Sequence, residues 1–266
     1  MKILILATAA MLGLAGAQPA SAADVEMPTK APTMAPAPTF SWSGVYVGGN
    51  FGGGWGHTDY DSYLSSGALD FTGSYDSSGI FGGGQIGINF MVTPEVLFGF
   101  EADGDWSDIS GNSPGCTATG CSTGHTTIND FGSARFRAGY AWNNLLLYGT
   151  GGWAWSESGT DRTIKCVGAT CAAGGSGIVS PLVGMVASSS GTQSGWAAGA
   201  GVEWGFLPHW SLRLQYLHLE FDNIGRDFAY PGFPTAFRHT EANTGLDTVS
   251  IGVNYLFNWA PPGAYR

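Results

Sequence analysis

Apolar and polar side chains alternate with a period of two along most of this chain after residue 40. Successive side chains of a strand point to opposite faces, so each alternating segment predicts a β-strand with one apolar face and one polar face. Almost no helical periodicity occurs in the same region. The eight predicted strands cover roughly residues 44–56, 79–91, 95–107, 128–141, 145–157, 194–207, 210–221 and 246–258.

Seven charged residues inside these segments lie at the parity opposite to that of the apolar residues of the same segment, so they share one face. The opposite parity carries apolar residues such as Phe98, Phe136 and Leu214. A soluble sheet needs a second layer over its apolar face, and the sequence shows no helix to supply one. An apolar outside and a charged inside are what a closed barrel in a lipid bilayer requires. The seven charged residues predicted to face the lumen are Glu101, Asp103, Asp105, Arg135, Arg137, Glu203 and Arg213.

The links between the segments alternate between short and long. A segment of about 12 residues fits a tilted membrane strand, which has about 9 to 11 residues in hydrocarbon. We therefore predict an all-β fold: an eight-stranded antiparallel up-and-down transmembrane β-barrel with short periplasmic turns and long extracellular loops. The short links are residues 92–94, 142–144 and 207–209, and the long links are roughly 57–78, 108–127, 158–193 and 222–245.

Tryptophan residues gather at the ends of the predicted strands. Amphipathic rings at both ends of a membrane strand are typical of the aromatic girdles that meet lipid headgroups. Buried tryptophans of a soluble sandwich would not concentrate at strand ends. We assign Trp55, Trp106, Trp155 and Trp196 to the long-loop girdle, and Trp42, Trp142, Trp210 and Trp259 to the short-turn girdle.

The first residues have the pattern of a secretory signal: Lys2, an apolar run of about a dozen residues, and a small-residue cleavage site ending at Ala22. The run is too short to span a membrane. We expect a signal peptide over residues 1–22, a Pro/Ala-rich periplasmic linker over 23–41, the barrel over 42–259, and a C-terminal extension over 260–266. Export places the chain in an oxidising compartment, which bears on its cysteines.

Composition narrows the function classes. The chain has 43 glycines, 13% aromatic residues and only 11% charged residues, a mixture that argues against disorder. Its formal net charge of −10 argues against a nucleic-acid partner. The expected partners are outer-membrane lipid, lipopolysaccharide and the barrel-assembly machinery, while homo-oligomerisation is left open.

Four cysteines form two closely spaced pairs in two of the long links: Cys116 with Cys121, and Cys166 with Cys171. In an exported protein this spacing predicts two local disulfides. A four-cysteine zinc site is the alternative, but the spacing is wider than the usual two-residue gap. We therefore expect no bound metal.

Three segments carry a family likeness: Trp42–Gly52, Ala134–Tyr140 and Ile251–Tyr255. They resemble the small outer-membrane β-barrel family of alphaproteobacteria, which contains surface antigens, haem-binding relatives and porin-family proteins. The resemblance covers about residues 1–258 and implies an eight-stranded barrel of the Gram-negative outer membrane. One departure concerns the chain end: the family ends on an aromatic residue, whereas Phe257 is followed here by nine more residues.

The predicted luminal charges suggest two functions. Counting along the strands places Glu101 level with Arg135, and Glu203 level with Arg213, so cross-strand ion pairs should fill the narrow lumen. The leading hypothesis is a structural and surface-display role with a plugged lumen. The second hypothesis is a narrow channel for ions or small solutes.

A haem-receptor function, prompted by the family resemblance, would use His57, His125 or His239 in the predicted loops. We find no spacing typical of catalysis and expect no enzyme activity. The run Gly82–Gly87 matches a dinucleotide-binding fingerprint, but strand alternation continues through it, so we expect no cofactor.

Overall fold

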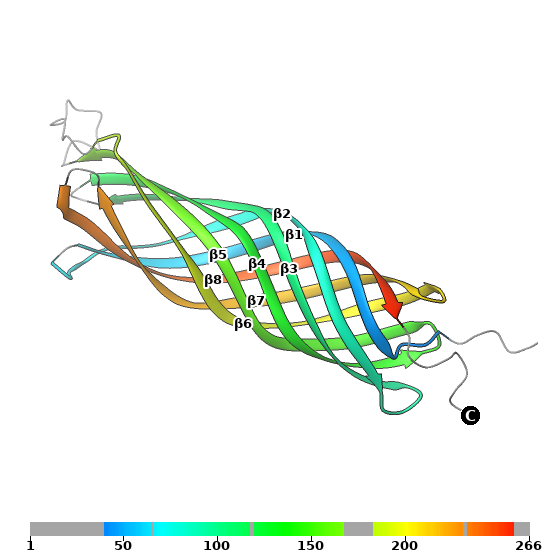
Figure 1. Ribbon diagram of the computed structural model, residues 1–266. Coiled ribbons are helices and arrows are strands. Elements are labelled where there is room, and N and C mark those ends of the chain that lie inside the picture. Colours follow the sequence, from blue (N-terminus) through cyan, green and yellow to red (C-terminus); the bar gives the residue numbers. More distant parts are fainter. Residues whose placement is uncertain (1–39, 65, 118–119, 168–182, 231–232, 258–266) are drawn as a thin grey trace, which may run out of the picture. The chain divides into compact units, whose positions relative to one another are not determined.

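The computed structural model describes residues 40–64, 66–117, 120–167, 183–230 and 233–257. Eight antiparallel strands make up most of this part of the chain (Figure 1). No helix among the described residues is long and apolar enough to cross a membrane. The strands are β1 (Gly44–Leu64), β2 (Leu69–Met91), β3 (Val96–Thr117), β4 (Gly120–Trp142), β5 (Leu145–Val167), β6 (Val186–Leu207), β7 (Trp210–Tyr230) and β8 (Phe233–Phe257).

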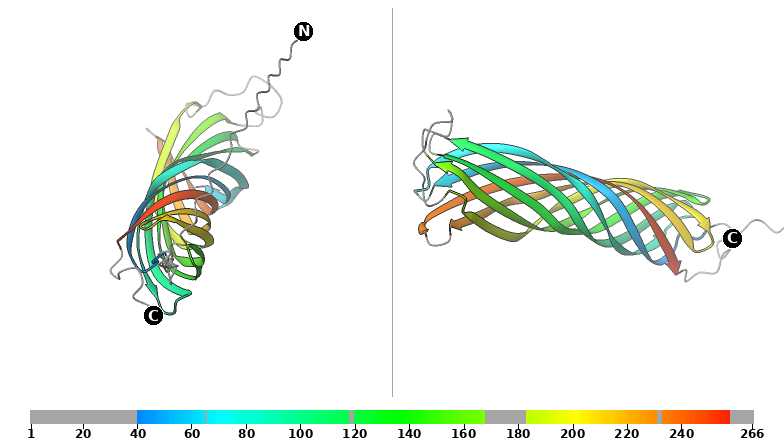
Figure 2. Two further views of the ribbon diagram at one scale, coloured as in Figure 1. Left: turned by 90° about the vertical axis from the view of Figure 1, so that its right-hand side faces the viewer. Right: turned by 90° about the horizontal axis from the view of Figure 1, so that it is seen from above.

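Each strand pairs with its neighbours in sequence, and β1 pairs with β8 to close the barrel. The closing ladder is long, running from Val45 opposite Phe257 to Leu64 opposite Arg238. The strands wind around a common axis (Figure 2). Closure gives the strands hydrogen-bonding partners on both sides, which a sheet in hydrocarbon needs because no water is available to its edges. The predicted eight-stranded antiparallel barrel is confirmed.

The alternation of the sequence becomes an outward and an inward face. Outward apolar side chains in the half of the barrel nearer the short turns are exposed, for example Phe100 at 59% and Leu214 at 52%. We call this zone the apolar belt; it extends outward to the level of Trp55, Trp106 and Trp196. An exposed apolar surface of this extent is typical of a face that meets lipid.

The strands are about twice as long as predicted, at 21 to 25 residues. Most residues expected to form long loops continue the ladders instead: β1 and β2 pair as far as Tyr63 opposite Leu69, and β3 and β4 as far as Thr117 opposite Gly120. The prediction missed these extensions because most of their outward residues are polar. Outside a membrane the outer face has no need for apolar residues, so the period-two signal is lost.

One end of the barrel has the short turns that the sequence predicts, and we call it the short-turn end. The other end, to which the long strands extend, is called the far end. Asn143 adopts a left-handed backbone with φ of 55° in the two-residue link between β4 and β5. Asparagine tolerates this conformation, which tight hairpin turns require. The predicted signal peptide, the extension 260–266 and all of the linker except Phe40 and Ser41 lie outside the described residues.

The apolar belt predicts a depth-dependent cost for charge on the outer face. Ala200 and Ser190 are both small, exposed and outward-facing on β6, but only Ala200 lies within the belt. We expect Ala200→Arg to destabilise the barrel in lipid vesicles by about 2–4 kcal/mol, and Ser190→Arg by about 0–1 kcal/mol. Urea unfolding followed by tryptophan fluorescence measures both, and equal costs would contradict the placement of the belt.

Candidate functional site

Six charged side chains meet in the lumen of the short-turn half. Glu101 lies at the centre and is 3% exposed. Its carboxylate accepts hydrogen bonds from Nη2 of Arg135 at 2.6 Å and from Nη1 of Arg213 at 2.9 Å. The hydroxyl of Tyr46 donates a further bond to it at 2.5 Å. This set, here called the ionic layer, consists of Glu101, Asp103, Arg135, Arg137, Glu203 and Arg213.

The ionic layer balances its own charge. Nη2 of Arg135 lies 2.6 Å from Oδ1 of Asp103, and Nη2 of Arg137 donates to Oε2 of Glu203 at 2.7 Å. Three guanidinium groups therefore face three carboxylates. Removing a charge from water costs several kcal/mol, so each buried ion needs a partner of opposite sign close by.

One predicted ion pair is wrong. Glu203 and Arg213 are direct cross-strand neighbours, yet no ion pair joins them in the described structure. Glu203 instead binds Arg137, and Arg213 binds Glu101. Both side chains point toward the axis of a narrow barrel, so each finds a closer partner across the lumen than beside it.

Asp105 is the seventh predicted luminal charge and is 5% exposed. It has no ion pair with an arginine in the described part of the chain, contrary to the expected cross-strand pairing of the luminal charges. Asp105 lies two residues further along β3 than Asp103, which already pairs with Arg135. Asp105 is therefore closer to the far end of the barrel than the arginines of the ionic layer.

Two clusters of buried apolar residues lie on either side of the ionic layer. The short-turn cluster consists of Trp42, Tyr46, Leu97, Ala141, Leu146, Tyr148 and Leu256, with Phe40 and Met91 packed against it. The mid-lumen cluster consists of Phe81, Ile109, Ile128, Phe131, Ala154, Ala197, Leu217, Leu219, Phe221 and Leu246.

Seven strands contribute side chains to the mid-lumen cluster, and β1 contributes glycines instead. A Cβ atom on Gly52 would lie 2.6 Å from the ring of Phe81, and one on Gly54 would lie 2.8 Å from Ile109. These glycines make room for the large side chains of neighbouring strands. Part of the glycine content of the chain thus follows from packing a narrow lumen.

The tryptophan predictions have mixed outcomes. Trp142 and Trp210 are exposed at the short-turn end, Trp155 is half-buried, and Trp259 lies outside the described residues. The assignment of Trp42 to a girdle is wrong: it is 2% exposed, and its indole donates to the carbonyl oxygen of Asn143. Trp42 precedes the start of β1 at Gly44, so strand parity does not govern its side chain.

The cysteines lie near the far end. The backbone register places Cys121 opposite both Cys116 and Cys166, and Cys121 takes part in a disulfide. The side chains of Cys116 and Cys166, and all of Cys171, lie outside the described residues. The pairing of Cys116 with Cys121 and of Cys166 with Cys171 therefore stays a prediction.

The candidate haem-ligating histidines are on the outward face beyond the belt, each beside a polar side chain. Nδ1 of His57 lies 2.7 Å from Oδ1 of Asp76, and Nδ1 of His239 lies 2.8 Å from Oδ1 of Asp227. His125 is paired with Asn112. None of the three lines the luminal cavity described next. No group of three or more metal-binding side chains occurs among the described residues.

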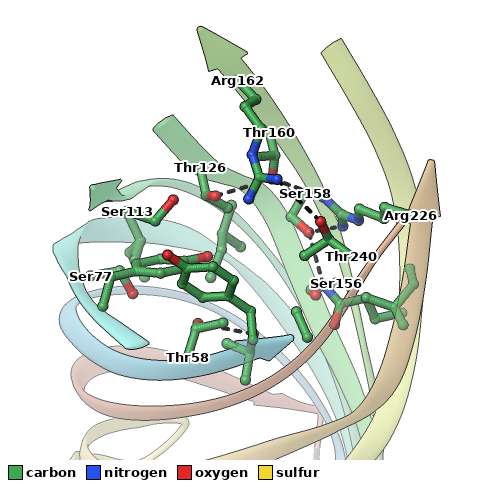
Figure 3. Close-up of a pocket in the computed structure, with 18 of the residues that line it drawn as sticks. Thr58, Ser77, Ser113, Thr126, Ser156, Ser158, Thr160, Arg162, Arg226 and Thr240 are labelled. Atoms are coloured by element: carbon green, nitrogen blue, oxygen red, sulfur yellow. Dashed lines mark hydrogen bonds between the residues drawn. The ribbon is translucent and has the colours of Figure 1, made fainter. Parts of the chain in front are cut away.

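A polar cavity occupies the lumen beyond the mid-lumen cluster, toward the far end (Figure 3). Most of its lining side chains bear hydroxyl groups, and Arg162 and Arg226 both reach it. The sequence pattern did not reveal this site, because both arginines lie in segments predicted as loops. A continuation of the β5 parity from Leu146 would have placed Arg162 inside.

Comparison with known proteins agrees with this architecture. Residues 7–257 match the family described as the outer membrane protein beta-barrel domain. A 31 kDa outer-membrane immunogenic protein of Brucella melitensis is 31% identical over 97% of this chain and 100% of its own length. A 25 kDa outer-membrane immunogenic protein of Brucella canis is 24% identical over 97% and 99%. The outer membrane protease OmpT of Escherichia coli shares the fold alone, with a TM-score of 0.50, 10% identity, and coverage of 84% of this chain and 99% of OmpT.

The central position of Glu101 predicts a large stability effect. Glu101→Gln removes the carboxylate charge that serves three arginines, and an uncompensated buried charge costs about 3–5 kcal/mol. The matched control is Glu157→Gln on the exposed outer face, which should change stability by less than about 0.5 kcal/mol. Urea unfolding measures both, and a loss below about 1 kcal/mol for Glu101→Gln would refute its central role.

The crossed ion pairs predict unequal couplings. Double-mutant cycles would combine Glu203→Gln with Arg137→Met and, separately, with Arg213→Met. We expect an interaction energy above about 1 kcal/mol for the bonded pair with Arg137, and at most half of that for the sequence neighbour Arg213. A larger coupling to Arg213 would mean that pairing follows strand neighbours after all.

Proposed function

Because this chain belongs to the outer membrane β-barrel family, which it matches over residues 7–257, we propose that it is a non-conducting scaffold displayed at the cell surface. The protein is an outer-membrane protein, as its family and its Brucella relatives are. The observation that carries the proposal is the ionic layer enclosed between two apolar clusters.

Three successive layers would oppose the passage of an ion. At the short-turn end it would meet the buried rings of Trp42 and Tyr46. It would then have to displace an arginine or a carboxylate from an ion pair at 2.6–2.9 Å. Beyond that, the mid-lumen cluster offers only hydrocarbon, and moving a charge there from water costs several kcal/mol.

The far half of the barrel supports the display role. Its strands extend beyond the apolar belt, and their outward side chains include the exposed acids Asp59, Asp76, Glu157 and Asp222. A polar outer face at this height suits contact with water and lipopolysaccharide, where divalent cations would bridge acidic side chains and phosphates. The short-turn end would then face the periplasm, with the assembly machinery as an earlier partner. The Brucella relatives are named as outer-membrane immunogenic proteins, which agrees with exposure at a surface.

A narrow ion channel is the second candidate, because charged residues do line part of the lumen. The two candidates differ in their electrical behaviour. A lumen filled by three layers should give no discrete current steps in a planar bilayer. A channel should give steps that depend on the charges of the ionic layer.

The test is single-channel recording on purified protein whose folded state is verified by heat-modifiable migration on a gel. We expect the wild-type barrel to stay silent at salt concentrations and voltages where a known porin, reconstituted in parallel, gives clear steps. Discrete steps in the wild type that disappear in Glu101→Ala or Arg135→Ala would overturn the scaffold proposal in favour of the channel.

A further inference from the structure

The cavity near the far end is polar and positively charged. Nineteen of the described residues line it, and no Asp or Glu is among these. The hydroxyl groups come from several strands, including Thr58 of β1, Ser77 of β2 and Ser156 of β5. Figure 3 shows these side chains around a common space, with Arg162 and Arg226 on one side of it. The described lining residues therefore supply no carboxylate to balance Arg226.

Both guanidinium groups are buried, with Arg162 at 6% and Arg226 at 8% exposure. Arg226 donates from Nη1 to Oγ1 of Thr160 at 3.1 Å and from Nη2 to Oγ of Ser158 at 2.6 Å. Arg162 donates from Nη1 to Oγ of Ser62 at 3.1 Å. The hydroxyl partners of Arg226 are neutral, so they orient its guanidinium group without cancelling its charge.

The contrast with the ionic layer is direct. There, every arginine has a carboxylate within 3.4 Å. Here, Arg226 has no carboxylate partner among the described residues. A buried charge of this kind is costly unless an ion of opposite sign joins it. An anion bound beside Arg226 would therefore offset the free-energy cost of burying its guanidinium group.

Two further lining atoms lack partners within the described structure. The hydroxyl of Ser156 and Oε1 of Gln193 are both buried without a hydrogen bond. Ser158 accepts bonds from Arg226 and from Nε2 of Gln193, which leaves its own proton available to an acceptor. The site thus offers guanidinium and hydroxyl donors to an oxyanion, together with an unpartnered amide oxygen, that of Gln193, which can only accept.

The size of the cavity limits the ligand. The cavity has a volume of about 50 Å³. One water needs a cavity volume of about 10–15 Å³, so the space suits a few waters or one small oxyanion. A macrocycle such as haem would not fit.

We propose that this cavity is a binding site for one phosphate group. Arg162 and Arg226 neutralise its charge, Ser156 and Ser158 donate hydrogen bonds, and Gln193 accepts the remaining proton of hydrogen phosphate. Sulfate has no such proton, so the amide oxygen favours phosphate over sulfate. The phosphate is either free inorganic phosphate or the phosphomonoester of a surface sugar; both present a divalent phosphate group to the two arginines, but at pH 7.5 only hydrogen phosphate keeps a proton for Gln193.

The experiment uses the full barrel in detergent micelles at pH 7.5, in chloride buffer without phosphate. Isothermal titration with inorganic phosphate should give one site per chain, with sulfate binding at least several-fold more weakly. Arg226→Gln should weaken phosphate binding at least tenfold. The matched control is Lys165→Gln, which removes one exposed positive charge from β5 outside the cavity and should leave the affinity unchanged.

A second measurement separates ligand binding from a merely structural role of Arg226. Without phosphate, Arg226→Gln should be at least as stable as the wild type, because it removes an unbalanced buried charge. With saturating phosphate, only the wild type should gain a higher unfolding midpoint. If the role of Arg226 were only structural, Arg226→Gln would instead lower the unfolding midpoint both with and without phosphate. That result would overturn the proposal.

The titrations with phosphate and sulfate can also refute the proposal of a phosphate site. No phosphate binding at millimolar concentration, or binding weakened equally by Lys165→Gln and Arg226→Gln, would show that no built site exists. Sulfate binding as tight as phosphate would remove the role of Gln193 and the assignment to phosphate. A parallel titration with glucose 6-phosphate identifies the source: tighter binding than inorganic phosphate supports a sugar phosphomonoester, and weaker binding supports the free ion.

Discussion

Hydrogen bonding of the backbone in hydrocarbon is the constraint from which the rest of this structure follows. No water is available there, so every N–H and C=O group must find a partner within the protein. Pairing β1 with β8 meets that demand by removing the two sheet edges. Closure in turn sorts side chains into one set that meets lipid and one that meets the lumen.

A lumen of eight strands is too narrow to be left to water, and its filling determines what it can do. The ionic layer is neutral because three arginines meet three carboxylates, and Glu101 is the group they share. In the cavity beyond the mid-lumen cluster, Arg226 has no carboxylate partner among the residues that the structure describes. One barrel therefore combines a self-sufficient ionic core with a positively charged recess.

Strand parity made much of this predictable from sequence. The inward position of Glu101 and Arg135 follows from a period of two wherever the other face must be apolar. Parity fails where its physical cause is absent. Trp42 lies before the first strand, and the extensions beyond the belt have no apolar face to reveal them. Arg226 is harder still, because a register shift between Phe221 and Ile224 reverses the parity that runs through Arg213.

Partner choice inside the lumen could not be predicted either. Sequence places Glu203 beside Arg213, but the distance across a barrel depends on its radius, tilt and the heights of all eight strands. The same limit hid the cavity, whose lining comes from residues as distant as Thr58 and Thr244. Such sites form only when the barrel closes and brings residues from distant strands together, and a pattern within one strand does not show this.

Depth-resolved spin labelling in lipid vesicles tests the central claim most directly. Labels would replace Phe98, Phe136 and Leu214 in the belt, and Asp59 and Ser190 beyond it, in a cysteine-free background. The account predicts that oxygen, which concentrates in hydrocarbon, relaxes the first three strongly, and that a water-soluble nickel chelate relaxes the last two. Strong relaxation of the belt labels by the nickel chelate would contradict it, because the apolar face would then meet water.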